Sequence, residues 1–325
     1  MSPAAAPTAD LSRIVDTISG YFVGQRLLLE KVLAGALANG HILFEDYPGL
    51  GKTLLVKVVA KSLGVESRRI QFTPDVLPAD ILGTKIWNPA TRKFEMFQGP
   101  IFSHILLADE INRAPPKTQS ALLEAMEERQ VTIEGQTVPI PPPFFVMATQ
   151  NPIEQEGTYP LPEAQMDRFL MRLSTGYPAD QAAEREILKR RISWRTEDPT
   201  KDVPAVVNQR QFVGYQTQVE NEVFIHEALL DYIASLIRSL REHPKVDVGP
   251  SPRGGLALLR LSRALALVRG RTFVVPDDLL DLAADALAHR TILDVDQILE
   301  GATSAQIVQE VLQTVPIPVR QVLQR

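Results

Sequence analysis

The sequence predicts an α/β domain built on a mostly parallel five-stranded sheet, followed by an all-helical domain. Short β-rich runs alternate with amphipathic helical segments up to residue 174, and such runs are missing after Pro178. A glycine-rich loop follows the first β-rich run. Strands that alternate with helices are typical of a parallel sheet covered by helices. With 325 residues, 45% of them hydrophobic, the chain is long enough for two domains.

The expected elements follow from the spacing of apolar residues. The strands are expected at 41–45, 69–73, 104–108, 144–149 and 169–173. Helices with a period near 3.6 residues are expected at 25–38, 52–63, 117–128, 225–240, 255–268, 277–289 and 304–312. Two further stretches predict β-hairpins: 82–100 turns at Asn88-Pro89-Ala90-Thr91, and 131–140 turns at Glu134-Gly135.

These elements divide the chain into three parts. We expect an N-terminal arm and linker (1–20), the α/β core with its two hairpins (21–195) and the helical domain (205–325), with a surface linker at 194–206. The first residues lack the charged and apolar regions of a secretion signal, and no run approaches the roughly 18 apolar residues of a membrane helix. We therefore expect a cytoplasmic protein without membrane insertion.

The charge and the cysteine content argue against several classes of function. The net charge of −5 argues against a general binder of nucleic acid, and the short basic cluster Lys189-Arg190-Arg191 is typical of a solvated helix face. The sequence contains no cysteine, which excludes disulfides, a thiolate nucleophile and cysteine-bound zinc. The five histidines show no metal-ligand spacing, so we expect them to be structural.

The strongest motif lies between the first strand and the next helix, in the stretch Glu45 to Thr53. Gly49 and Gly51 let backbone N–H groups face a polyphosphate at the positive end of the helix. Lys52 can reach the β and γ oxygens, and Thr53 can bind Mg²⁺. Asp46 stands where the strict P-loop pattern has its first glycine, and its side chain limits the backbone there. The alternative is a glycine-rich turn that caps a helix.

A second motif is the apolar strand Ile105 to Ala108 that ends in Asp109 and Glu110. The first acid can hold Mg²⁺ and its water, and the second can polarise the attacking water. Two acids after a strand are more often a solvated turn. Because Lys52 and Thr53 follow another strand of the same sheet, the pair favours a hydrolytic site.

Together with three further motifs, these residues give the chain a resemblance to AAA+ ATPases and, among them, to the MoxR family. The motifs are Gly49–Thr53, Asp109–Ala114, Thr118–Glu128, Ala148–Pro152 and Leu161–Phe169. The resemblance implies an AAA+ P-loop core with a helical lid, and it implies ATP and Mg²⁺. The guanine-reading pattern Asn-Lys-x-Asp of GTPases is missing, which agrees with ATP.

The resemblance also implies roles for four polar residues. Asn151 resembles sensor 1, which orients the attacking water or touches the γ-phosphate, and its alternative is an Asn-Pro turn. Arg168 resembles the arginine finger that enters the site of the next subunit. Its alternative is a surface ion pair, and Arg172 is the other candidate finger. Arg253, at the start of a lid helix, resembles sensor 2, which reaches the γ-phosphate, and its alternative is a solvated arginine beside a Pro-Gly turn.

Further contacts are implied for the base, the phosphates and a client. Val23, Gly24 and Gln25 match the segment beside the adenine, with a simple turn as the alternative. The phosphate-binding stretch is Pro48, Gly49, Leu50, Gly51, Lys52, Thr53 and Leu54. The two hairpins correspond to inserts that project toward the central pore of a ring. Trp87, Phe94 and Phe97 are then candidates for contacting a client polypeptide, and burial against the core is the equal alternative.

The resemblance implies a Mg²⁺-dependent ATPase that forms a homo-oligomeric ring, expected to be a hexamer. Its implied role is chaperone-like, remodelling or maturing a protein client by metal or cofactor insertion, with a von Willebrand factor A domain protein as a possible partner. Three alternatives remain open: a nucleic-acid motor, a P-loop kinase of small molecules and a nucleotide-binding scaffold without turnover. The charge counts against the first, Glu110 against the second, and the complete set of chemical groups against the third, although Asp46 keeps it open.

Overall fold

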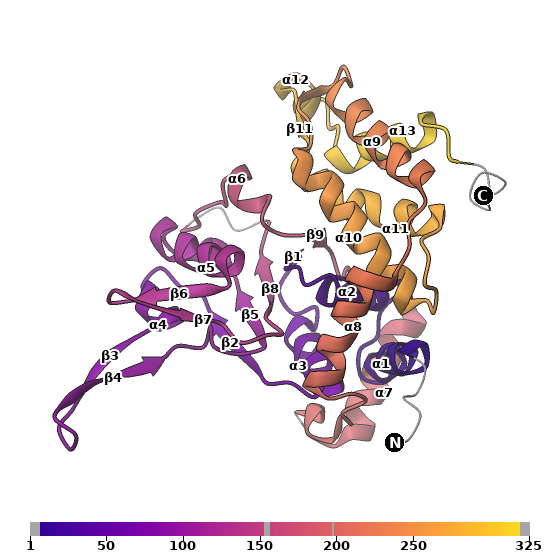
Figure 1. The fold of residues 1–325 in the computed structure, drawn as a ribbon. Coiled ribbons are helices and arrows are strands. Elements are labelled where there is room, and N and C mark those ends of the chain that lie inside the picture. The colour runs from indigo at the N-terminus through magenta and orange to yellow at the C-terminus, as the bar shows by residue number, and fades with distance from the viewer. Residues whose placement is uncertain (1–6, 153–156, 197, 319–325) are drawn as a thin grey trace.

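A parallel five-stranded sheet forms the centre of the first domain. The computed structural model describes residues 7–152, 157–196 and 198–318 (Figure 1). The strands are β1 (Ile42–Glu45), β2 (Ser67–Gln71), β5 (Ile105–Asp109), β8 (Phe145–Gln150) and β9 (Met171–Leu173). Their order is β2-β5-β8-β1-β9, and each neighbouring pair is parallel. The predicted fold class is confirmed, and each strand overlaps its predicted range.

Strand alternation divides the core between the two faces of this sheet. Ile42 and Phe44 join a cluster with α3 (Lys52–Ser62), whereas Leu43 joins a second cluster with α5 (Pro116–Glu128). Successive side chains of a strand point to opposite faces. Both faces are therefore covered by helices, as a buried parallel sheet requires.

The predicted N-terminal arm is wrong from residue 7 onward. Residues Pro7–Tyr21 form helix α1, which packs against α2 (Arg26–Leu37) and α3. Its apolar stripe of Leu11, Ile14, Val15 and Ile18 is buried, which follows from helical spacing of these positions. The segment is part of the core rather than a linker. Helix α7 (Gln181–Trp194) closes this domain in the sequence.

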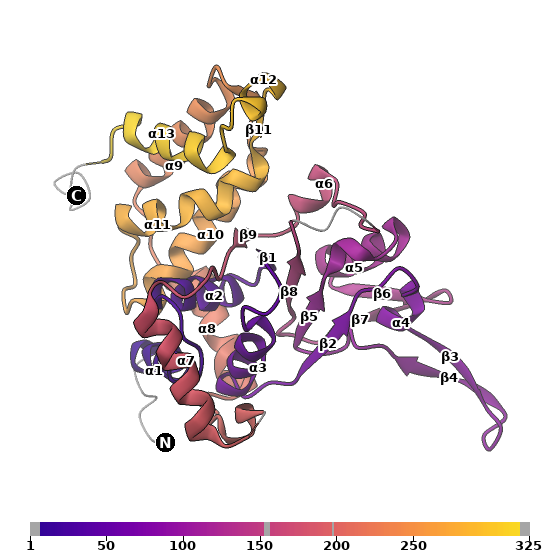
Figure 2. The same ribbon diagram turned by 180° about the vertical axis from the view of Figure 1, so that it is seen from behind.

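Two hairpins leave the α/β core. After helix α4 (Pro78–Leu82), β3 (Gly83–Asn88) pairs with β4 (Lys93–Gln98) in an arm that projects from the body (Figures 1 and 2). The second hairpin pairs β6 (Gln130–Ile133) with β7 (Gln136–Pro139). Both hairpin predictions are confirmed.

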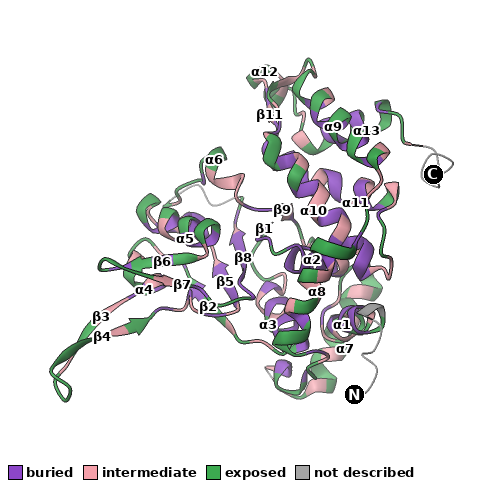
Figure 3. Cartoon of the chain, viewed as in Figure 1, coloured by how far each residue is buried: buried purple, intermediate pink, exposed green. Residues whose placement is uncertain are grey.

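The aromatic residues of the first hairpin are exposed rather than buried. Trp87, Phe94 and Phe97 are 49%, 67% and 63% exposed. Figure 3 shows most of this arm in the exposed class, in contrast to β5 and β8. Burial against the core, which the sequence left as an equal alternative, is therefore wrong.

The C-terminal domain is helical with one small sheet. Its elements are a short 3₁₀ turn (Pro199–Asp202), α8 (Gln209–Glu222), α9 (Glu227–Arg241), α10 (Pro252–Val268), α11 (Pro276–Leu287), a second 3₁₀ turn (Ala288–Arg290), α12 (Val295–Leu299) and α13 (Ser304–Thr314). Strands β10 (Val246–Val248) and β11 (Ile292–Leu293) pair antiparallel between them. The expectation of an all-helical domain is corrected in this detail.

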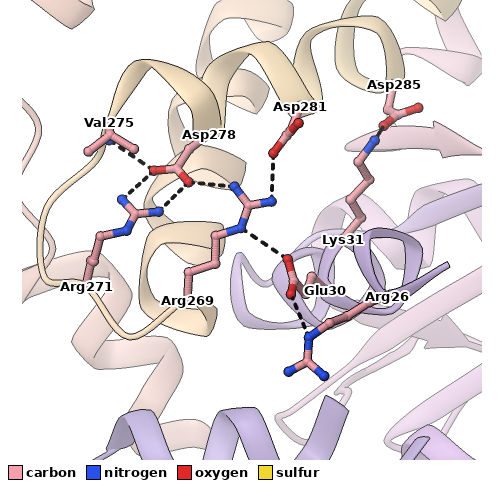
Figure 4. A network of polar contacts seen from close by, with 9 residues as sticks. All are labelled: Arg26, Glu30, Lys31, Arg269, Arg271, Val275, Asp278, Asp281 and Asp285. Atoms are coloured by element: carbon pink, nitrogen blue, oxygen red, sulfur yellow. Dashed lines mark hydrogen bonds and ion pairs between the residues drawn. The ribbon is translucent and has the colours of Figure 1, made fainter. Parts of the chain in front are cut away.

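The lid is joined to the core by apolar and charged contacts. One continuous cluster of buried residues runs from α1, α2 and α3 into α8, α10 and α11. Beside it lies a polar network in which Arg269 contacts Glu30 of α2 and Asp278 and Asp281 of α11 (Figure 4). Lys31 of α2 pairs with Asp285 of α11 at 2.5 Å between Nζ and Oδ2. Within the described part of the chain, none of the helices is long and apolar enough to cross a membrane.

Candidate nucleotide site

The loop between β1 and α3 borders a cavity of about 400 Å³. Gly49 and Gly51 have φ values of +84° and +80°, a backbone conformation that glycine adopts at little cost. A Cβ atom on Gly49 would meet nothing within 4 Å, so the backbone conformation, not crowding, favours glycine. No described side chain caps α3 at Gly51, which leaves the first backbone N–H groups of the helix available to an anion.

Asp46 fills the first P-loop position with a buried carboxylate, only 5% exposed. Its oxygens accept hydrogen bonds from Ser174 Oγ at 2.6 Å and from the backbone N and Oγ1 of Thr175 at 2.8 and 2.9 Å. The backbone N of Gly176 also donates to it, at 3.3 Å. The side chain therefore fastens the loop to the connection between β9 and α7.

Lys52 lies in this cavity with 9% of its surface exposed. Its Nζ donates a hydrogen bond to the carbonyl of Tyr47 at 2.7 Å, which closes the loop over the start of α3. Burial lowers the pKa of Lys52, whereas the charges of Asp46, Asp109 and Glu110 raise it. Three carboxylates thus offset part of the cost of burying the ammonium group.

Asp109 ends β5 at the same cavity and has both carboxylate oxygens engaged. Arg69 of β2 donates to Oδ2 from Nε at 3.0 Å and from Nη2 at 2.7 Å. Thr149 of β8 donates to Oδ1 from its hydroxyl at 2.6 Å. Thr53 lines the cavity as well. A hydroxyl and a carboxylate beside a phosphate site are the hard oxygen ligands that suit Mg²⁺, so the residues present fit this ion.

Glu110 directly follows Asp109 with a left-handed backbone, φ 57°. Its Oε2 accepts a hydrogen bond from Gln71 Nε2 at 2.7 Å and pairs with Arg113 Nε at 3.0 Å. Its backbone N–H donates to the Thr149 hydroxyl at 2.8 Å. That hydroxyl therefore contacts the carboxylate of Asp109 and the backbone of Glu110, whereas Gln71 of β2 holds the carboxylate of Glu110.

Sequence reasoning missed four residues of this cavity: Arg69, Gln71, Thr149 and Gln150. Arg69 lies in the middle of β2, whereas Gln71, Thr149 and Gln150 lie at or next to the carboxyl ends of β2 and β8, where open α/β sheets bind ligands. For these last three, the strand-end position was the available signal. Asn151, which was predicted, follows β8, is 9% exposed and lines the cavity with the others.

An adjoining apolar pocket of about 490 Å³ gathers the residues predicted beside the base. Val23, Gly24, Gln25 and Leu54 line it, and it shares the stretch 49–51 with the phosphate cavity. Aromatic pairs flank it. Tyr21 stacks on Trp194 with ring centroids 6.2 Å apart, and Tyr47 stacks on Tyr177 at 5.7 Å. An apolar pocket beside a phosphate cradle has the composition that a nucleotide requires.

The arginines that the sequence predicts to act on the phosphates lie outside the phosphate cavity, which is the cavity of about 400 Å³ beside the glycine-rich loop. Arg168, which follows the short helix α6 (Glu163–Met166), donates from Nη1 to the Leu123 carbonyl at 2.9 Å and pairs with Glu127 Oε2 at 2.8 Å. Arg253 Nη2 donates to Glu127 Oε1 at 2.6 Å, and this hydrogen bond lowers the pKa of Glu127 below its ordinary value. Neither arginine is among the described residues that line the phosphate cavity. The expectation that Arg253 reaches the phosphates of its own chain is not met in this arrangement.

Arg172, the other candidate finger, lies on β9. Its Nη1 pairs with Glu45 Oε2 at 2.9 Å, and Gln150 Nε2 donates to the other oxygen of the same carboxylate at 2.8 Å. The side chain of Arg172 therefore pairs with a residue of the neighbouring strand. Arg172 is not among the described residues that line either cavity.

The comparisons with known proteins agree with this fold. The family described as ATPase family associated with various cellular activities (AAA) matches residues 41–171, and the AAA lid domain matches residues 238–311. The sheet, the phosphate loop and the paired acids therefore belong to an AAA ATPase with its lid.

Similar proteins show to which family of AAA ATPases the chain belongs. The chain is 46% identical over 310 residues to the protein YeaC of Bacillus subtilis, covering 95% of each chain. It is 42% identical over 323 residues to the Chaperone MoxR1 of Mycobacterium tuberculosis, covering 97% of this chain and 84% of that one. A crystal structure from Cytophaga hutchinsonii superimposes with a TM-score of 0.88 at 40% identity over 96% of both chains. The chain belongs to the MoxR family of AAA+ ATPases.

Proposed function

We propose that this chain hydrolyses ATP with Mg²⁺ in a homo-oligomeric ring and uses the reaction to remodel a protein client. The observation that carries the proposal is the convergence of Lys52, Asp109, Glu110 and Asn151 on one cavity that adjoins an apolar pocket. Phosphate binding, metal binding and water activation are the functions that hydrolysis of a nucleoside triphosphate requires.

The residues divide these tasks by their chemistry. Lys52 and the N–H groups at the start of α3 bind the β- and γ-phosphates. Thr53 and Asp109 hold Mg²⁺, which when bound neutralises charge on the phosphate oxygens. Glu110 orients the attacking water and takes its proton, and Asn151 fixes the water or the γ-phosphate by a hydrogen bond. The Thr149 hydroxyl fixes the two residues relative to each other, since it contacts the carboxylate of Asp109 and the backbone N–H of Glu110.

Two arginines act on the nucleotide of a neighbouring subunit in this proposal. Arg168 and Arg253 share the carboxylate of Glu127 and are not among the described residues of the phosphate cavity. Their side chains are 31% and 52% exposed, so both can be reached by a second copy. A permanently charged fork brought in from a neighbour stabilises the transferring phosphoryl group. A closed ring, which we propose to be a hexamer, supplies every site with such a neighbour.

The client-binding element in this proposal is the β3–β4 hairpin. Trp87 and Phe94 pack edge to face with centroids 5.3 Å apart and remain about half or more exposed. Exposed aromatic side chains on a projecting arm favour contact with an unfolded or partly folded polypeptide. The relative named as a chaperone supports a protein client. More narrowly, we propose maturation of an enzyme by metal or cofactor insertion, with a von Willebrand factor A domain partner, on the strength of family membership alone.

Steady-state release of phosphate tests the enzymatic part. We expect Mg²⁺-dependent turnover by the wild type, loss of nucleotide binding in Lys52→Ala, and retained binding with turnover reduced about 100-fold or more in Glu110→Gln. Equal phosphate release by all three proteins would contradict the proposal. Salt-dependent stimulation by DNA or RNA would instead favour the nucleic-acid motor.

A further inference from the structure

A buried arginine of the lid forms hydrogen bonds to the residues on both sides of Arg168. The side chain of Arg290, in the 3₁₀ turn after α11, is 3% exposed. Its Nε donates to Asp167 Oδ1 at 2.7 Å, and its Nη2 donates to the carbonyls of Asp167 at 2.9 Å and Phe169 at 2.6 Å. Its Nη1 donates to the carbonyls of Leu170 at 3.2 Å and Ala286 at 2.6 Å. The guanidinium thus holds the backbone on both sides of Arg168.

The second carboxylate oxygen of Asp167 contacts another element of the lid, the start of α10. We call the contacts of Asp167 with Arg290 and Ser251 the Asp167 junction. Ser251 Oγ donates to Asp167 Oδ2 at 3.1 Å and accepts a hydrogen bond from the backbone N of Arg253 at 3.2 Å. Ser251 is the N-cap of α10, so it fixes the turn of helix from which Arg253 projects. One carboxylate therefore connects the lid arginine Arg290 to the helix start that bears Arg253.

Only an arginine fits this junction. A planar guanidinium has five N–H donors in a fixed fork, and here every nitrogen has an acceptor. Lysine has a tetrahedral ammonium and cannot reach the same carbonyls together. A neutral replacement leaves the buried carbonyls and Asp167 without their partner.

Attachment of the lid does not depend on this residue. The continuous apolar cluster and the network of Lys31, Glu30 and Arg269 with α11 already join the two domains (Figure 4). The contact between the lid and Asp167 has a role other than attachment of the lid. It sets the position of Arg168 and Arg253, whose own guanidinium groups meet on Glu127.

We propose that Arg290 is a positioning residue that aims Arg168 and Arg253 at the nucleoside triphosphate of the neighbouring subunit. The inference rests on the proposed function, in which these arginines act across a subunit interface. Any rotation of the lid moves Arg290 and Ser251, and with them the segment that bears Arg168. The junction thereby couples the orientation of the lid in one subunit to phosphoryl-group stabilisation in the next.

The test compares Arg290→Gln and the isosteric Asp167→Asn with wild type in the full chain. We expect ATP affinity within about twofold of wild type and turnover lowered at least tenfold, because misplaced charge costs rate rather than binding. The control is the double variant Lys31→Met with Asp285→Asn, which removes a lid–core ion pair in which neither Asp167 nor Arg168 takes part. Its turnover should stay near that of wild type. Wild-type turnover in Arg290→Gln would overturn the proposal.

Mixed assemblies separate positioning from folding. Arg290→Gln keeps its own cavity, and Glu110→Gln keeps its own arginines, so an equimolar mixture should regain about a quarter of wild-type turnover from randomly formed interfaces. Arg168→Ala mixed with Glu110→Gln is the reference. Recovery in the reference without recovery for Arg290→Gln would overturn this inference alone. No recovery in either mixture would refute action of Arg168 across the interface. If Arg290→Gln does not fold, Asp167→Asn answers the same question.

Discussion

At the residue scale, Asp46 is the departure from the P-loop pattern whose effect the structure explains. Its φ is not positive, since it is not among the described residues with positive φ, so the position does not require glycine. The carboxylate accepts hydrogen bonds from Ser174, Thr175 and Gly176. Those residues lead directly to Tyr177, which lines the adjoining apolar pocket. The side chain thus ties the glycine-rich loop to the wall of that pocket.

Asp46→Ala should raise the KM for ATP about tenfold, with a smaller change in kcat. The substitution leaves buried donors unpaired, each at a cost of about 1–3 kcal/mol, and loosens both pockets. Steady-state kinetics measures this. Ser174→Ala, which removes one of the donors, is the matched control and should have a milder effect. A wild-type KM in Asp46→Gly, the residue of the strict motif, would contradict this role.

His41 gives the fold a defined response to acid. Its Nδ1 accepts a hydrogen bond from the backbone N of Val146 at 3.0 Å, and its Nε2 lies 3.1 Å from the carbonyl of Met126. The acceptor role of Nδ1 requires a neutral ring. Burial, followed by the charge of Arg129, lowers the pKa of His41 to about 3.

The free energy of unfolding should therefore fall as the pH drops below about 6.5. The unfolded chain binds a proton there that the folded chain excludes until about pH 3, at about 1.4 kcal/mol per pH unit. Chemical unfolding at pH 7, 6 and 5 measures the slope. His41→Asn keeps an acceptor for Val146 and should show a shallower slope. An unchanged slope in that variant would refute the assignment.

Where a motif has fixed spacing, the sequence predicted which residues lie together. Lys52, Thr53, Asp109 and Glu110 follow buried strands in recognisable patterns, and the structure brings them to one cavity. The partners of these residues were not predictable in the same way. Gln71 and Thr149 are polar residues at strand ends, which occur in most sheets, and only the pairing of β2 with β5 and of β5 with β8 brings them to the acids.

At the element scale, the β3–β4 hairpin is largely exposed. Its base depends on close backbone contact: a Cβ on Gly83 would lie 2.2 Å from the Phe97 carbonyl oxygen, and one on Gly99 would lie 2.2 Å from that of Ile81. The glycines let the two strands leave the body together. The alternating pattern predicted the hairpin, but exposure of its aromatic residues depends on what packs beside it, which the pattern does not contain.

Trp87→Ser with Phe94→Ser should leave ATP affinity, basal turnover and melting temperature unchanged, because both side chains are exposed and remote from the cavity lining. Stimulation of turnover by a permanently unfolded polypeptide should be lost. The control is Lys93→Ser on the same hairpin, which keeps the aromatic pair. Equal stimulation of the aromatic variant and the wild type would argue against the hairpin as the client-binding element.

At the scale of the whole molecule, the sequence predicted two domains but not how they join. The five strands were predicted, yet their order depends on long-range pairing that single runs do not encode. Likewise, the apolar faces of α1, α2 and α10 each predict that the helix is buried on one side. They do not indicate which element packs against that side. The structure merges them into one core, so lid and core are packed together rather than linked by a free hinge.

The central claim is that a complete catalytic site needs two copies of the chain, one for the cavity and one for Arg168 and Arg253. The most direct test is turnover per subunit at increasing protein concentration in Mg²⁺-ATP, measured beside the mass of the assembly by sedimentation. We predict that turnover per subunit rises in step with the fraction assembled, and that Arg168→Ala assembles without this rise. A turnover per subunit that is constant from the monomer range upward would contradict the account.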